Sequence, residues 1–361
     1  MNTISSNTAI SYPTEPVGAL SVRVPGSVEE IIDAFIRALD AKNTTRLSYR
    51  KALRQFFRWV ESSGRSVGEL RREDILAYRE HLLEESFPHS ELTVSLYMTA
   101  IRRFYAWAEG EKLYPNIGRD IKSPRKNKKS FKKMHLTDEQ GADYLEGFLS
   151  REKERACAIE ACQGQRVHQK LAFRNLHRMS VRDYAMVSLM LYCGLRTVEV
   201  SRLNIGDVSF KSGRRILWVQ GKGHDAKDAY VILIDQAWEP VRAYLATRPG
   251  APAAAPLFVC EGYGSEGRRI STKRIQTISK EGFRRIGLDS HEYSAHSLRH
   301  TTGVMIVKNG GGLLDVQTVL RHENPATSEI YIASAMEEIR LQNAPESRLA
   351  GCFQKTGTRS A

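Results

Sequence analysis

The sequence predicts a mainly α-helical protein with one small β-sheet, built as an N-terminal helical bundle followed by a C-terminal α+β domain. Three observations predict this class. Apolar residues recur at helical spacing through both halves of the 361-residue chain. Runs rich in β-forming residues are confined to residues 207–234. A basic segment without apolar periodicity, residues 116–135, separates the two patterned regions, as a linker between domains of roughly 150 residues would.

Composition excludes several classes of protein. Apolar residues make up 41% of the chain and charged residues 26%, which is typical of a globular protein with a sizeable core. No apolar run approaches the roughly 18 residues that a membrane span needs, and the N-terminus lacks the pattern of a secretory signal. Five scattered cysteines exclude a disulfide scaffold and a four-cysteine zinc site. These features together favour a cytoplasmic protein that has no contact with a membrane.

The charge balance points to a polyanionic partner. Lysine and arginine number 54 against 41 acidic residues, a net charge of +13, so the chain is either a nucleic-acid-binding protein or a generally basic cytoplasmic protein. Residues 116–135 hold eight of the basic residues against one acidic residue, which is over half of the excess. Their mutual repulsion predicts an extended linker, which is a spacer, a localisation tag or a strap along phosphates, and we favour the strap. Its phosphate-contact candidates are Arg125, Lys126, Lys128, Lys129, Lys132 and Lys133.

The bundle is predicted over residues 27–115, after a flexible arm at residues 1–26. Ser27 and Glu30 have the spacing of a capping box before a first amphipathic helix. Further helices are predicted after Asn43, from about Arg72 to Glu84 and from about Ser90 to Glu109. Their aromatic residues are predicted to lie in the core: Phe56, Phe57, Trp59, Phe104, Tyr105 and Trp107.

One face of the second helix is basic and offers a second candidate DNA contact. Arg46, Arg50 and Arg54 lie on this face, opposite the apolar stripe. A solvated helix face is the commoner meaning of such a pattern, so both interpretations stay open.

The C-terminal domain is predicted over residues 136–345, with a tail at 346–361. Thr137 caps its first helix, and residues 150–180 read as two helical pieces with a surface excursion. Cys157, Cys162 and His168 fall in this region, but their spacing matches no metal-ligand pattern, so no metal site is predicted.

Cationic, imidazole and phenol side chains recur at the predicted element boundaries of this domain, where functional side chains tend to lie. Arg196 follows a buried helix that ends at Gly194, and Lys222 lies between two glycines in a β-hairpin turn. Considered alone, Lys222 would be interpreted as an ordinary surface lysine of a hairpin. The last third adds His296 and Arg299 at the start of a helix, His322 at the end of the next, and Tyr331 in a short final helix.

These motifs resemble those of the tyrosine recombinases, or phage-type integrases, and particularly their Xer-like simple members. The segment 193–200 (CGLRTVEV) is similar to the box around the family's first catalytic arginine, and Gly221-Lys222-Gly223 to its lysine hairpin. The segment 296–300 (HSLRH) is similar to its His-x-x-Arg box. His322, followed nine residues later by Tyr331, is similar to its last box. The resemblance implies a SAM-like core-binding bundle and a tyrosine recombinase catalytic domain.

One position departs from the family pattern. Arg321 stands where the family usually has a glycine before the histidine. An arginine there would either crowd the turn or add a contact to phosphate.

The chemistry implied by the resemblance needs no metal or cofactor. Two guanidinium groups, of Arg196 and Arg299, would hold the non-bridging oxygens of a phosphodiester, and His322 would donate a further hydrogen bond. The remaining roles are Tyr331 as nucleophile, His296 as general base, Lys222 as general acid and Glu199 as a support for the arginine or histidine. A surface carboxylate is nearly as good an account of Glu199.

The implied function is site-specific DNA recombination through a 3′-phosphotyrosine intermediate, in integration, excision or resolution. The expected partner is double-stranded DNA at a specific site, bound by a homotetramer in the synaptic complex, with a monomer free in solution. The segment 336–341 would either dock on a neighbouring subunit or form a polar tail. The alternatives are a type IB topoisomerase-like enzyme and a cleavage-deficient DNA-binding regulator on the same scaffold.

Overall fold

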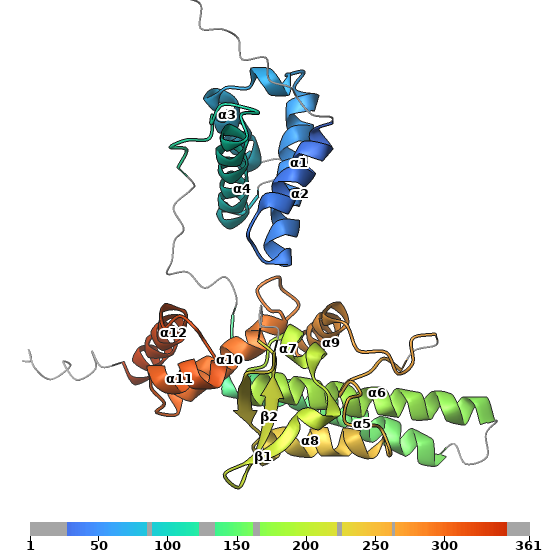
Figure 1. Cartoon of the computed structure of the whole chain (residues 1–361). Helices are drawn as coiled ribbons and strands as arrows, with labels where there is room; N and C mark the ends of the chain where they lie inside the picture. The colour runs from blue at the N-terminus through green and yellow to red at the C-terminus, as the bar shows by residue number, and fades with distance from the viewer. Residues whose placement is uncertain are drawn as a thin grey trace, which may run out of the picture. The chain divides into compact units, whose positions relative to one another are not determined.

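A computed structural model describes residues 27–84, 89–122, 134–161, 167–221, 226–261 and 264–344. The chain divides into two compact units, residues 1–128 and 129–361 (Figure 1). Both are mainly helical, and the described strands form a single small sheet in the second unit, so the predicted fold class is confirmed. No described helix is both long and apolar enough to cross a membrane.

The N-terminal unit is a bundle in which α2 packs against α1 and α4, and α3 packs against α4. Its helices are α1 (Val28–Ala38), α2 (Asn43–Ser62), α3 (Arg72–Leu83) and α4 (Glu91–Gly110), with a short 3₁₀ turn at Val67–Glu69. The Ser27 side chain accepts from the Glu30 N–H, and Glu30 accepts from the Ser27 N–H, which is the predicted capping box. The sequence therefore sets where the bundle begins.

Aromatic rings fill the centre of the bundle, as predicted. Phe104 meets Phe35 and Phe57 edge to face, with ring centroids 5.6 and 5.4 Å apart. Trp59 and Trp107 are partly buried against the same core. These rings therefore pack in or against the core of the bundle, which confirms the prediction that the aromatic residues belong to the core.

The chain keeps contact with the bundle beyond α4. Ile121 is buried in the bundle core, and its carbonyl accepts a hydrogen bond from Arg102 at 3.1 Å. Arg72 donates to the Arg119 carbonyl at 2.9 Å. The first residues of the predicted linker thus lie on the bundle, and its six phosphate-contact candidates lie outside the described residues.

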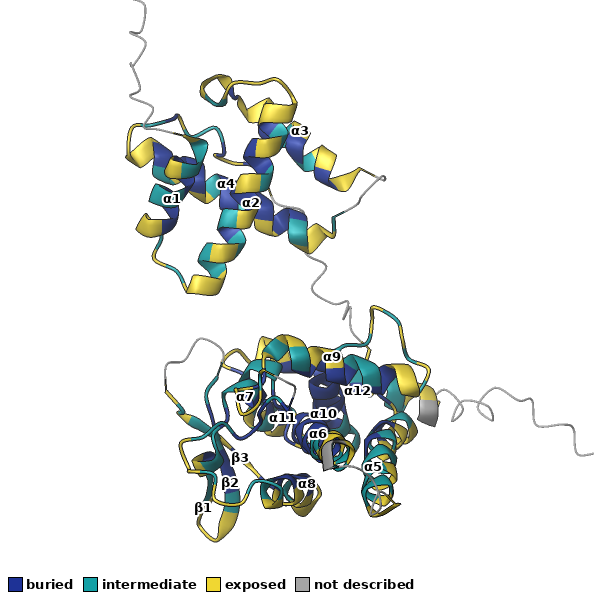
Figure 2. Ribbon diagram, turned by 90° about the vertical axis from the view of Figure 1, so that its right-hand side faces the viewer, coloured by how far each residue is buried: buried dark blue, intermediate teal, exposed yellow. Residues whose placement is uncertain are grey.

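The C-terminal unit is built on the long helix α6, which packs against α5, α8 and α10. Its elements are α5 (Asp138–Ala161), α6 (Val167–Tyr192), α7 (Thr197–Arg202), a 3₁₀ turn (Ile205–Asp207), β1 (Val208–Lys211), β2 (Arg214–Val219), β3 (Ala229–Ile232), α8 (Asp235–Ala246), α9 (Thr272–Arg285), α10 (Ala295–Lys308), α11 (Leu313–Leu320) and α12 (Ala326–Asn343). Figure 2 shows the buried faces of α6 and α10 turned to the inside of this unit.

The sheet is antiparallel with strand order β1-β2-β3. Phe210 of β1 pairs with Arg215 of β2, and Trp218 of β2 pairs with Tyr230 of β3. One face of the sheet contributes Leu217, Val219 and Val231 to the core.

The two helical pieces predicted for residues 150–180 are present: residues 150–161 end α5 and residues 167–180 begin α6, and the two helices run side by side (Figure 1). The excursion predicted between them, residues 162–166, lies outside the described residues. One predicted element differs from the structure. The final helix is not short: α12 continues through the segment 336–341 to Asn343. Its buried Ala335, one turn after Tyr331, packs on the same cluster as Val304 of α10, and this packing extends the helix.

Candidate active site

Arg196, Arg299, His322 and Tyr331 lie together in the C-terminal unit, although the sequence spreads them over four elements. Arg196 precedes α7, Arg299 lies in the second turn of α10, His322 follows α11, and Tyr331 lies in α12. The assembly depends on α10, because this helix packs against α6, α11 and α12. Tertiary packing thus brings together groups that are distant in the chain.

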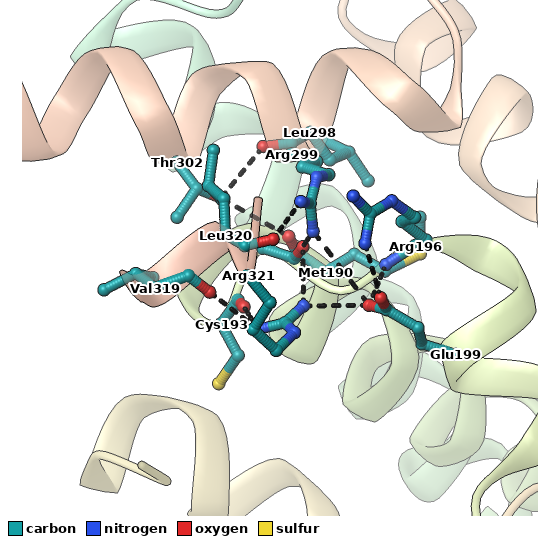
Figure 3. A network of polar contacts seen from close by, with 11 residues as sticks. Met190, Cys193, Arg196, Glu199, Leu298, Arg299, Thr302, Val319, Leu320 and Arg321 are labelled. Carbon is teal, nitrogen blue, oxygen red and sulfur yellow. Dashed lines mark hydrogen bonds and ion pairs between the residues drawn. The ribbon is translucent and has the colours of Figure 1, made fainter. Parts of the chain in front are cut away.

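Arg196 is held at the start of α7 by Glu199. The Arg196 Nη1 lies 2.7 Å from Glu199 Oε1, and the Arg196 backbone N–H donates to Oε2 at 2.8 Å (Figure 3). The Arg196 side chain is 27% exposed, whereas that of Glu199 is fully buried. A buried carboxylate therefore anchors an arginine whose outer face stays open to a ligand, and Glu199 is not the surface residue that the sequence left as an alternative.

Arg299 is buried and bound to backbone carbonyls. Its Nη1 donates to the Gly194 carbonyl at 2.5 Å, and its Nη2 donates to the Leu320 carbonyl. Burial, with the nearby Arg196 charge, lowers the pKa of Arg299 to about 9, so the guanidinium is protonated at neutral pH. The two carbonyls fix the guanidinium between the turn after α6 and the end of α11.

The turn after α6 brings Gly194 close to α11. Gly194 has φ +59°, and a Cβ added there would lie 2.4 Å from Leu320 Cδ2. Thr302 of α10 donates to the Leu191 carbonyl at 2.6 Å, which ties α10 to the end of α6. Glycine is therefore required for both the conformation and the space.

Tyr331 is seated inside the unit, with 1% of its surface exposed. Its ring lies against His300 and His322, with centroids 4.9 and 5.6 Å away. Gly303 of α10 leaves the space that the ring occupies, because a Cβ there would come within 2.5 Å of Tyr331 Cδ1. Burial raises the pKa of the phenol, and the charges of Arg299 and Arg196 oppose that rise.

His322 has one ring nitrogen committed within the protein. Its Nδ1 lies 2.8 Å from the hydroxyl of the buried Ser328, in the first turn of α12. Burial and the Arg299 charge lower the pKa of His322 to about 4, so the ring is neutral at neutral pH. The hydrogen bond at Nδ1 leaves Nε2 as the nitrogen that can act on a ligand.

Sequence reasoning missed His300, Gly303 and Ser328, which all support the site. His300 is 1% exposed and meets His135 edge to face at 5.3 Å, and burial with the His135 charge lowers its pKa to about 3. The HSLRH motif contained His300, but nothing in the motif showed that its ring would face Tyr331.

Arg321 is the residue that departs from the family's sequence pattern. Its φ of +54° is the left-handed conformation that a glycine would adopt without strain. The side chain turns inward, and its Nη2 lies 2.8 Å from Glu199 Oε2 (Figure 3). The turn thus accommodates an arginine that makes an ion pair.

Two further residues were predicted for the site. His296 is exposed at the start of α10, one turn before Arg299, and its charge contributes to lowering the pKa values of His322 and His300. Lys222 lies outside the described residues.

The predicted DNA contacts on α2 are engaged with α1. Arg50 lies 2.8 Å from Asp33, Arg54 pairs with Glu29, and Arg46 donates to the Leu39 carbonyl at 2.7 Å. Arg50 and Arg54 are therefore paired with carboxylates of the preceding helix and Arg46 with a backbone carbonyl after it, and their contact with DNA stays a prediction. Exposed ion pairs of this kind contribute little to stability, so a phosphate could replace them at little cost.

Of the three cysteine and histidine positions weighed in the sequence, Cys162 and the His168 side chain lie outside the described residues. Cys157 is exposed on α5, and no group of three His, Cys, Asp or Glu side chains suited to a metal occurs among the described residues.

Both parts of the chain are similar to proteins of one known family. Residues 162–338 match the Phage integrase family, and residues 32–112 match the Phage integrase, N-terminal SAM-like domain. Tyrosine recombinase XerC of Caldanaerobacter subterraneus is 33% identical over 42% of this chain and 40% of that protein. XerC of Serratia marcescens is 26% identical over 84% of this chain and 90% of that protein. XerD of Shewanella oneidensis is 25% identical over 88% of this chain and 97% of that protein.

Solved structures share the fold. A post-cleavage complex of the XerH site-specific recombinase has a TM-score of 0.63 at 18% identity, over 89% of this chain and 85% of that one. The Tn1549 transposon integrase in complex with transposon right end DNA has a TM-score of 0.57 at 15% identity, over 88% of this chain and 100% of that one. From the two family matches and the Xer relatives, the chain belongs to the phage integrase family of tyrosine recombinases.

Proposed function

We propose that this protein is a site-specific DNA recombinase that cleaves and rejoins DNA through a 3′-phosphotyrosine intermediate. One observation carries the proposal: Tyr331 lies in the same unit as Arg299, Arg196 and His322, within reach of both arginine charges. A phenol beside two guanidinium groups suits attack on a phosphodiester, because the guanidiniums stabilise both the phenolate and the charge on the phosphorus oxygens.

The reaction follows from these groups. The Tyr331 oxygen attacks phosphorus, the bond to the 5′ oxygen breaks, and Arg196 with Arg299 binds the non-bridging oxygens. His322 donates from Nε2, as its neutral ring allows. His296 takes the phenol proton and Lys222 protonates the leaving 5′ oxygen. The phosphotyrosine bond keeps the energy of the broken one, so a 5′-hydroxyl from another strand reverses the step without ATP.

Phosphate must gain access to the site. Arg299 and Tyr331 are each 1% exposed, so a DNA backbone reaches both only after the segments that cover them open. The Tyr331 phenol interacts with Arg299 in addition to the ring contacts with His300 and His322, so the seat keeps Tyr331 beside this arginine.

The proposed partner is a specific double-stranded DNA site, bound by a homotetramer in the synaptic complex and approached by a monomer in solution. The net charge of +13 supports DNA binding, and we propose the segment 125–133 as a strap on phosphates. On α12, Met336 and Leu341 are 55% and 75% exposed, which supports docking of this helix on a neighbouring subunit.

The test begins with a substrate. A library of nicked duplexes with random sequence, incubated with the protein, is sorted for DNA that remains attached under denaturing conditions. Enriched sequences then serve as suicide substrates. We expect a covalent adduct with the native chain and none with Tyr331→Phe. Arg299→Ala should bind the site with little change in Kd and form no adduct.

The alternatives give different results. Relaxation of supercoils without sequence preference or synapsis would replace the proposal by a topoisomerase-like activity. Binding without any adduct would leave a DNA-binding regulator.

A further inference from the structure

Arg321 adds a third guanidinium to the cluster at the site. It stands at the C-terminal end of α11, and 11% of its side chain is exposed. Its Nη1 donates to the Val319 carbonyl at 2.6 Å, and its Nη2 lies 2.8 Å from Glu199 Oε2. The side chain thus links the segment before His322 to the helix that begins after Arg196.

The two oxygens of Glu199 are divided between two arginines. Oε1 lies 2.7 Å from Arg196 Nη1, and Oε2 lies 2.8 Å from Arg321 Nη2 (Figure 3). Arg299 Nη1 is 4.0 Å from the same Oε2. A side chain at 321 without charge would leave Glu199 to neutralise the two arginines that are proposed to bind phosphate.

The charge balance decides what Arg321 contributes. Three guanidiniums and one carboxylate leave two positive charges in excess. Attack of a phenolate on a phosphodiester brings together two negative charges, so the cluster matches the charge of the transition state. Without Arg321 the excess falls to one.

Arg321 also keeps Glu199 ionised. Burial alone would raise the pKa of this carboxyl, and the Arg321 charge is the largest effect opposing it, so the pKa lies below its usual range. The left-handed backbone of Arg321 is strained for a residue other than glycine, and the ion pair with Glu199 holds the side chain in place there.

We propose that Arg321 is a positioning residue for the strand cleavage reaction: it balances the charge of Glu199, so that Arg196 and Arg299 keep their full charge for the scissile phosphate. This proposal rests on the proposed function. Arg321 acts through Glu199 and the arginines, and needs no contact with DNA.

The test measures single-turnover adduct formation on the suicide substrate and DNA affinity separately. Arg321→Met keeps the length of the side chain and removes its charge, and we expect adduct formation to slow by about 10- to 100-fold with Kd changed less than about threefold. Arg321→Lys should recover part of the rate. Arg321→Gly relieves the backbone strain and should be as slow as Arg321→Met.

A second substitution separates charge from structure. Glu199→Gln in the Arg321→Met background restores the two excess charges, and its amide oxygen can still accept the Arg196 N–H, so this double variant should be faster than Arg321→Met alone. In Arg321→Met, loss of the opposing cation raises the pKa of Glu199, so the rate should show a pH dependence in addition to that of the native chain, and Glu199→Gln should abolish the added dependence. Arg242→Met, which removes an exposed ion pair with Glu239 on α8, is the matched control and should cleave normally.

The outcomes are distinct. If the native chain forms no adduct, the proposed function fails and Arg321 has no reaction to position. If the native chain cleaves and Arg321→Met stays within about threefold of it, the Arg321 proposal is overturned. It is also overturned if Arg321→Met is slow and neither Arg321→Lys nor the Glu199→Gln double variant is faster, because only a structural role would give that result.

Discussion

Gly303→Ala tests whether the seat of Tyr331 controls cleavage. The added Cβ would lie 2.5 Å from Tyr331 Cδ1, 2.8 Å from Cγ and 2.9 Å from Cε1. Carbon atoms in contact lie about 3.5 Å apart, so the ring must move by about 1 Å. Because the methyl group meets the ring itself rather than a flexible side-chain end, the whole α12 segment has to accommodate it.

The size of the effect differs between stability and rate. An alanine in place of glycine inside a helix adds up to about 1 kcal/mol to the free energy of unfolding, while overpacking removes about 1–3 kcal/mol. The net loss of stability is therefore about 0–2 kcal/mol. A displacement of about 1 Å of a reacting group can slow the reaction about 100-fold, so cleavage should suffer far more than folding.

The assay compares Gly303→Ala with Gly147→Ala. Gly147 lies inside α5, and an added Cβ there would have only Arg285 Cδ near it, at 4.0 Å. Because alanine has a higher helix propensity than glycine, this control should unfold at a higher temperature than the native chain. It should cleave the suicide substrate at the native rate. Adduct formation by Gly303→Ala within about threefold of the native rate, with both variants folded, would refute a controlling role for the seat.

Two further predictions concern pH and salt. His322 and His300 have pKa values lowered to about 4 and about 3 by burial, so the stability they confer is complete above pH ~6.5 and is lost as pH falls toward those values. Urea unfolding between pH 7 and 4.5 should show this loss, and His300→Gln should flatten it by up to about 1.4 kcal/mol per pH unit; an unchanged slope would contradict the assignment. Replacement of Lys126, Lys128, Lys129, Lys132 and Lys133 by glutamine should weaken binding to any duplex and reduce the salt dependence of log Kd by about 0.9 for each phosphate that is no longer bound. The same slope as the native chain would exclude a strap on phosphates.

The sequence predicted the fold class and four residues that meet in the C-terminal unit because these signals are local. Arg196 follows a glycine that ends a helix, and the Arg299 motif opens a helix, so short segments reveal them. The order of the motifs along the chain then indicated, through the family resemblance, that His322 and Tyr331 belong to the same site.

Other features depend on packing between distant segments, and the sequence could not reveal them. The ion pair between Arg321 and Glu199 joins residues 122 positions apart. The fit of Tyr331 over Gly303 requires the crossing of α10 and α12. The pairing of Arg50 on α2 was missed for the same reason, since a helical pattern describes one helix and omits the carboxylate that the neighbouring helix presents.

The geometry of the site rests mainly on one helix. In α10, Arg299 reaches the turn at Gly194, and Gly303, one turn later, receives the Tyr331 ring. A single rigid element therefore sets both Arg299 and the seat of Tyr331. Arg196 is instead anchored by Glu199 in α7. Arg321 at the end of α11 ties that anchor to the segment before His322, which explains how an arginine can persist at a backbone position that favours glycine.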